Sequence, residues 1–176
     1  MLAAGPYVIV FRIVHIMAAI AWAGSVFLFA VFIQPSVAAI APAGAPFMGE
    51  LLGKRKLVDR LIALGTITVI AGLFLYWHDW HDFGSWGNWI GSRFGVTMTI
   101  GAVFAIAALG TGIFGTRPNV IRLLSMGRQA AEGGGPPPPE LAAEIGRTQV
   151  RLKILGRTGL GLIAVAALAM SIARYL

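Results

Sequence analysis

The sequence contains no cysteine, and this absence removes several kinds of chemistry at once. The chain can form no disulfide, no thiolate metal site and no iron–sulfur cluster, and it cannot attach a c-type haem covalently. The three histidines of the chain therefore become the main candidates for binding a metal ion or a haem iron.

Charged residues are also scarce, at 12% of the chain against about 25% in a typical soluble domain. Hydrophobic residues make up 57%. So little polar surface cannot coat a water-soluble particle, and the composition indicates an integral membrane protein. The 176 residues suffice for one bundle and leave no room for a second folded domain.

Four stretches have the length of about 20 mostly apolar residues that is needed to cross a bilayer. The first could be read as a signal peptide, but no positive charge precedes its apolar region, which is also too long. We therefore predict one all-α domain over residues 1–176, a transmembrane four-helix bundle with a flexible Gly/Pro linker at 133–139. The spans are expected at about residues 7–33, 57–77, 94–115 and 154–173.

The net charge of +7 raises the question of nucleic-acid binding, which the positions of the basic residues argue against. Lys and Arg cluster beside the apolar spans, four between the first two and seven between the last two, and only Arg12, Arg93 and Arg174 lie on the other side. This asymmetry sets the orientation of membrane proteins. It predicts a multi-pass protein of the bacterial inner membrane, with both termini outside, two longer cytoplasmic connections and the lipid bilayer as partner.

The first span carries an arginine and a histidine on one helical stripe. Intramembrane ionisable residues usually mark a function. Haem b could use His15 as axial ligand, Arg12 as partner of a propionate and Trp22 as apolar lining. Alternatively, Arg12 reaches the headgroups and His15 bonds a neighbouring backbone or threonine. With three-four spacing, the stripe comprises Arg12, His15, Ala18, Ala19, Trp22, Val26 and Phe29.

A second set of candidate ligands follows the second span, in a segment with four tryptophans typical of a membrane interface. If the helix continues, His78 and His81 share a face, and so do Asp79 and Asp82. Two imidazoles and a carboxylate suit zinc or copper(II). His78 has a rival use as the second axial ligand of a haem on His15, and Met98 is another candidate for that position.

The stretch RIVHIMAAIAWAGSVFLF resembles the first helix of small bacterial membrane proteins of the copper-resistance protein D-like and HemJ-like group. The shared features are a histidine, a tryptophan seven residues later and then a small residue, here His15, Trp22 and Gly24. The resemblance implies four or more helices and a link to haem b or copper handling. The chain departs from these relatives in having no histidine inside its third span and no lysine inside any span.

Three functions follow from these observations. The first is haem b binding, or service to a haem or redox process such as electron transfer, near the outer membrane face. The second is a non-catalytic accessory subunit without a cofactor, packed in a membrane complex or homo-oligomer. The third is an outward-facing protein that binds copper or zinc or is linked to copper transport. No catalytic residue is assigned, because neither a Ser-His-Asp pattern nor a phosphate loop is evident.

Overall fold

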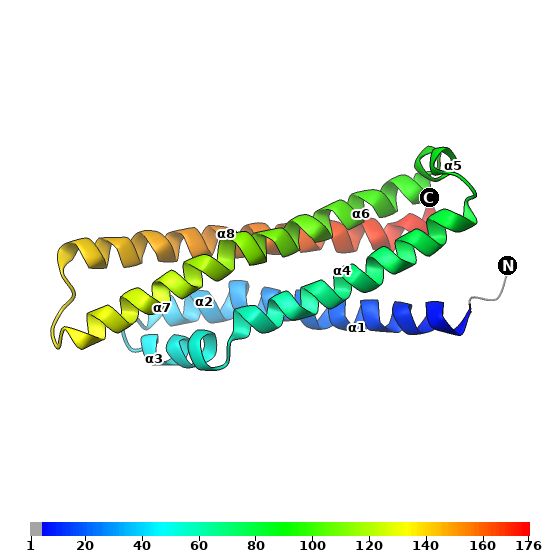
Figure 1. Cartoon of the computed structure of the whole chain (residues 1–176). Coiled ribbons are helices and arrows are strands. Elements are labelled where there is room, and N and C mark those ends of the chain that lie inside the picture. Colours follow the sequence, from blue (N-terminus) through cyan, green and yellow to red (C-terminus); the bar gives the residue numbers. More distant parts are fainter. Residues whose placement is uncertain (1–4) are drawn as a thin grey trace.

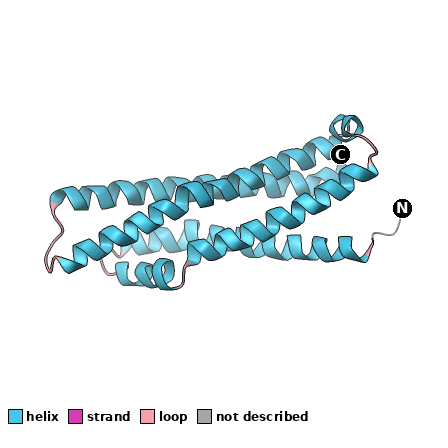
Figure 2. Cartoon of the chain, viewed as in Figure 1, coloured by secondary structure: helices cyan, strands magenta, loops and turns pink. Residues whose placement is uncertain are grey.

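The computed structural model describes residues 5–176, and that range contains helices and connecting loops but no strand (Figures 1 and 2). The predicted all-α four-helix bundle is confirmed. Several helices follow one another without a break, and the segments labelled η are π-helical turns (η1, η2 and η3) or a 3-10 turn (η4). In chain order they are α1 (Pro6–Leu28), η1 (Phe29–Ile33), α2 (Gln34–Ala39), α3 (Ala45–Met48), η2 (Gly49–Lys54), α4 (Leu57–Asp82), α5 (Trp86–Gly91), α6 (Arg93–Gly110), η3 (Thr111–Thr116), α7 (Arg117–Glu132), α8 (Pro139–Ile172) and η4 (Ala173–Tyr175).

Four of the resulting rods are long and apolar enough to cross a membrane, and the chain is a multi-pass membrane protein. The shortest has 26 residues. At 1.5 Å per residue that is about 39 Å, more than the roughly 30 Å of a hydrocarbon core. The helices outlast the predicted apolar spans, and two of them continue past a proline, Pro35 and Pro118, each in the first turn after a π-helical turn. The rods are Pro6–Ala39, Leu57–Asp82, Arg93–Glu132 and Pro139–Tyr175.

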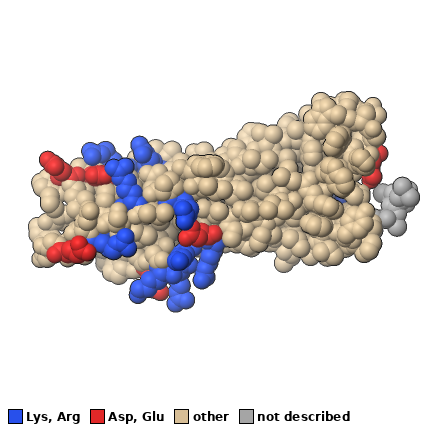
Figure 3. All heavy atoms as spheres, in the orientation of Figure 1, with Lys and Arg blue, Asp and Glu red and all other residues tan. Residues whose placement is uncertain are grey.

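The rods run lengthwise beside one another, so that the bundle has two distinct ends (Figure 1). We call the end with α5 and the C-terminus the histidine end, because His78 and His81 lie there at the close of α4. The opposite end is the basic end. Lys and Arg side chains gather in that half of the molecule, and the other half is almost free of them on the face shown in Figure 3.

Interhelical ion pairs hold the basic end together. The guanidinium of Arg117 donates to the carboxylate of Asp59 at 2.7 Å and so ties α7 to α4. Arg122 pairs with Glu144 across the α7–α8 hairpin. The Gly/Pro segment predicted at 133–139 is the connection of this hairpin, and α8 already begins at its last proline. Proline suits a first helical turn, since its missing N–H would have no partner there.

The short helix α5 folds back over the histidine end and buries Trp89 completely (0% exposed). The indole N–H donates to the hydroxyl of Tyr76 at 2.8 Å, and that oxygen lies 2.7 Å from the hydroxyl of Thr99. Thr99 donates its own hydrogen to the carbonyl of Gly95 at 2.7 Å. Tyr76 must therefore donate to Thr99, and a directed hydrogen-bond chain links α5, α4 and α6.

Gly95 makes this arrangement possible, because the carbonyl of Trp89 occupies the space that a side chain would need. A Cβ at position 95 would lie 2.1 Å from that oxygen. We expect Gly95→Ala to push α5 off the bundle and to cost about 1–3 kcal/mol, as other overpacked sites do. The loss would appear as a lower thermal unfolding temperature of the purified protein in detergent.

Gly91→Ala, at the end of α5, is the matched control, because nothing lies within 4 Å of a Cβ at that position. Equal unfolding temperatures for the two alanine variants would contradict the close contact between Trp89 and Gly95.

Candidate functional site

The seam between α1 and α4 is built from large side chains of α1 seated on glycines of α4. A Cβ at position 65 would lie 2.9 Å from the indole of Trp22, and one at position 72 would lie 2.7 Å from Cε1 of His15. Nearer the histidine end, Phe11 and Phe74 stack with ring centroids 4.0 Å apart. These contacts fix the register of two antiparallel helices, and small residues allow the close approach.

The imidazole of His15 is anchored to the backbone of α4. Its Nδ1 lies 2.8 Å from the carbonyl oxygen of Thr68, whose residue is buried (4% exposed). A carbonyl oxygen can only accept, so Nδ1 carries the hydrogen and Nε2 keeps a lone pair. Nε2 forms no hydrogen bond with residues 5–176. It is also not fully buried, because among those residues the fully buried side-chain atom without a partner is Nδ1 of His78. Nε2 is therefore at least partly exposed on the half-buried side chain of His15.

The predicted stripe of α1 faces the bundle over most of its length. Ala18 and Trp22 are buried, and Trp22 belongs to a core cluster with Ala108 and Ile163. Arg12 departs from the stripe, because its side chain is exposed. Trp22 therefore fills the interior of the bundle, two turns further along the α1–α4 seam than His15.

His78 lies at the outermost part of the same seam. Its ring contacts Tyr7 of α1 with centroids 6.2 Å apart. Its Nδ1 lies 3.6 Å from a carboxylate oxygen of Asp79 and 3.7 Å from one of Asp82, too far for a hydrogen bond to either. Among the residues described, this nitrogen is the buried side-chain atom without a hydrogen-bond partner. The continued helix thus brings three of the four predicted metal ligands together.

His81, the fourth predicted metal ligand, turns to different neighbours. It is exposed, and its ring stacks on Trp77 with centroids 5.5 Å apart. Over residues 5–176, no group of three or more His, Asp or Glu side chains is arranged to hold a metal ion. Binding of copper or zinc stays a prediction without support from the geometry.

The structure does not bring the predicted second axial ligands to His15. His78 is six residues beyond Gly72 on α4, roughly 9 Å at 1.5 Å per residue, and the Phe11–Phe74 stack lies between the two histidines. Met98 is on α6 beside Thr99, at the level of Tyr76. Each stands nearer the histidine end of the bundle than the anchored imidazole.

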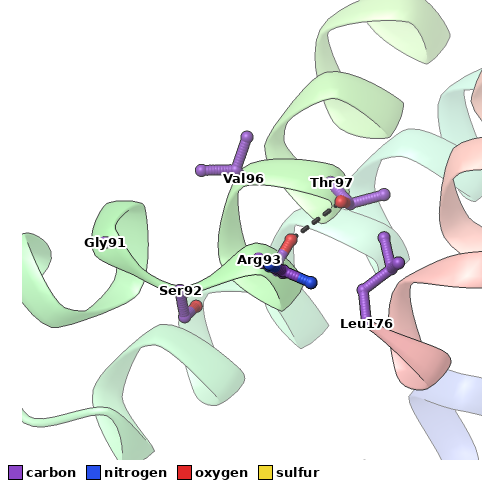
Figure 4. Close-up of a pocket in the computed structure, with 6 residues that line it drawn as sticks. All are labelled: Gly91, Ser92, Arg93, Val96, Thr97 and Leu176. Atoms are coloured by element: carbon purple, nitrogen blue, oxygen red, sulfur yellow. Dashed lines mark hydrogen bonds between the residues drawn. The ribbon is translucent and has the colours of Figure 1, made fainter.

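No histidine lines either of two open cavities on the surface of residues 5–176. One, of about 260 Å³, lies at the histidine end between the start of α6 and the C-terminal Leu176 (Figure 4). The other, of about 550 Å³, lies at the start of α8 beside Glu144 and Arg147. A group held by His15 would therefore rest against the face formed by α1 and α4.

Comparison with protein-family models, with curated proteins and with solved structures found no match to this chain. The resemblance of the first helix to copper-resistance protein D-like and HemJ-like proteins accordingly stays a prediction. What is known of the site comes from its own geometry.

The alternative in which His15 bonds a neighbouring backbone or threonine agrees with the structure, but the sequence did not single out Thr68 or Gly72. Nothing in the sequence distinguishes Gly72 and Thr68 from the other small residues and threonines, because glycine and threonine are frequent throughout the spans. The carbonyl that accepts from His15 belongs to the backbone, so no side-chain pattern announces it.

We predict that Gly72→Ala displaces the imidazole of His15, because the new Cβ would lie 2.7 to 2.9 Å from ring atoms. The Nδ1–H bond to Thr68 would break, and the Nδ1-protonated tautomer would lose its advantage. Nitrogen NMR of histidine-labelled protein measures this directly, since protonated and unprotonated ring nitrogens have well-separated shifts.

Gly161→Ala is the control, as nothing lies within 4 Å of a Cβ at that position. An unchanged tautomer in Gly72→Ala would mean that the Thr68 carbonyl does not hold His15.

Proposed function

We propose that this protein binds haem b through Nε2 of His15, near the outer face of a bacterial inner membrane, and serves electron transfer or haem handling. The orientation follows from the eleven basic residues that flank the spans at one end and the three at the other. On that basis the basic end is cytoplasmic, and both termini and the histidine end face outward.

The observation that carries this proposal is the hydrogen bond from Nδ1 of His15 to the carbonyl of Thr68. Metal-ligating histidines usually donate their second ring nitrogen to a carbonyl or carboxylate, which fixes the tautomer and raises the basicity of the other nitrogen. The same bond here leaves an accessible lone pair at membrane depth. An unpaired polar atom is costly in hydrocarbon. Coordination of a haem iron would give the lone pair of Nε2 a partner.

The surrounding residues suit a haem at the level of the donor set. His15 would be a ligand of the iron, and Arg12, one turn nearer the outside, would pair with a propionate. Ala19, one turn further from His15 along the same stripe, is small and half-buried. When bound, the haem would supply one-electron chemistry, and the chain would orient it against the face formed by α1 and α4.

A second candidate is an accessory subunit without a cofactor, and the seating of His15 itself favours it. A ring that lies on Gly72 and bonds Thr68 already joins α1 to α4. In that case the accessible Nε2 would accept a hydrogen bond from a partner helix.

The visible spectrum separates the two candidates. The protein would be purified in mild detergent from haem-replete cells and recorded oxidised and dithionite-reduced. We expect a Soret band that is lost in His15→Ala, because the iron loses its ligand.

His81→Ala removes an exposed histidine that stacks on Trp77, and it should keep the band. A colourless wild-type preparation would contradict haem binding and leave the accessory subunit, whereas equal Soret bands in wild type and His15→Ala would rule out His15 as the ligand.

A further inference from the structure

We propose that the haem site is completed by a second copy of this chain, so that one haem b lies between two His15 side chains. This rests on the proposed function and adds the stoichiometry, the second ligand and the oligomeric state.

The first step is that each chain offers one oriented nitrogen to an iron with two axial positions. Two ligands on opposite sides of one iron are about 4 Å apart, twice a metal–imidazole bond of about 2 Å. His78 does not meet this requirement, because its ring packs on Tyr7 beyond the Phe11–Phe74 stack.

Met98 is displaced in the same direction. Its neighbour Thr99 bonds Tyr76, which lies four residues beyond Gly72 on α4, roughly 6 Å nearer the histidine end. Met98 also belongs to α6, whereas the ring of His15 lies on α4. Within one chain, neither candidate stands opposite the accessible Nε2.

A second copy meets the requirement by symmetry. Two identical chains insert with the same orientation, so a two-fold axis along the membrane normal relates them in a dimer. Such an axis preserves depth, and the His15 side chains of both copies then lie at one level on either side of it. A closed two-fold interface pairs each patch with its own copy, which is the arrangement that two axial imidazoles need.

The charges agree with a ratio of one haem to two chains. Haem b carries two propionates, and each chain has one arginine on α1, Arg12, one turn from His15. Its side chain is exposed and forms no ion pair with residues 5–176. Two copies supply two such guanidinium groups at the same depth, one for each propionate.

The test measures haem content, protein mass and spin state on the same detergent-purified sample. We expect one haem for every two chains, a protein mass of twice 18.6 kDa, and a low-spin spectrum of iron with two imidazole ligands. One haem per chain, a monomeric mass, or a high-spin five-coordinate iron would each overturn the shared site and leave haem binding by His15 intact. A preparation without haem overturns the proposed function and this inference together.

A mixed dimer sharpens the test and does not depend on a variant that folds alone. Wild-type and His15→Gly chains with different affinity tags would be co-expressed, and the mixed pairs isolated by two successive purifications. We expect these pairs to lose the low-spin signal and to regain it on addition of imidazole, which replaces the missing ring. His81→Ala in place of His15→Gly is the control and should leave the low-spin signal unchanged. A low-spin signal in the mixed pairs without imidazole would show that the second ligand is not the partner's His15.

Discussion

The hydrogen bond between the imidazole of His15 and the backbone of Thr68 depends on the close approach of α1 and α4. Gly72 and Gly65 permit that approach, because His15 and Trp22 take the space of the missing side chains. In a bilayer no water competes for polar groups, so a histidine must find its partner within protein or ligand. The fold gives Nδ1 of His15 its hydrogen-bond partner, whereas Nε2 can still bind a ligand.

The histidine end obeys the same constraint by a different route. The indole of Trp89 donates to Tyr76, which donates to Thr99. Thr99 in turn donates to the carbonyl of Gly95, so that each of these polar side chains has a partner. His78 is the exception, with its Nδ1 near two carboxylates and bonded to neither. The two histidines of the seam thus differ, since one is oriented by a backbone carbonyl and the other is left without a hydrogen bond.

Hydropathy was sufficient to predict the four membrane-spanning helices, because crossing a bilayer requires about 20 apolar residues whatever the tertiary packing. The three-four spacing of a helix also placed His15, Ala18 and Trp22 on one stripe. A backbone partner for His15 was one of the two alternatives, but the particular carbonyl and the facing glycine could not be predicted, since a backbone carbonyl has no sequence signature and any of several glycines could have faced the ring. Trp89 was assigned to an interfacial aromatic belt, but the structure buries it. The reason is tertiary, as the carbonyl of Trp89 fits over Gly95 only after α5 turns back onto α6.

The burial of Trp89 has a consequence for the order of assembly during biosynthesis. Its ring meets Tyr76 of α4 and Phe94 of α6 edge to face, with centroids 5.0 and 5.6 Å apart. The site that receives Trp89 is complete only when both α4 and α6 have entered the bilayer. We therefore expect α5 to dock only after α4 and α6 lie side by side, because its tryptophan packs against both helices.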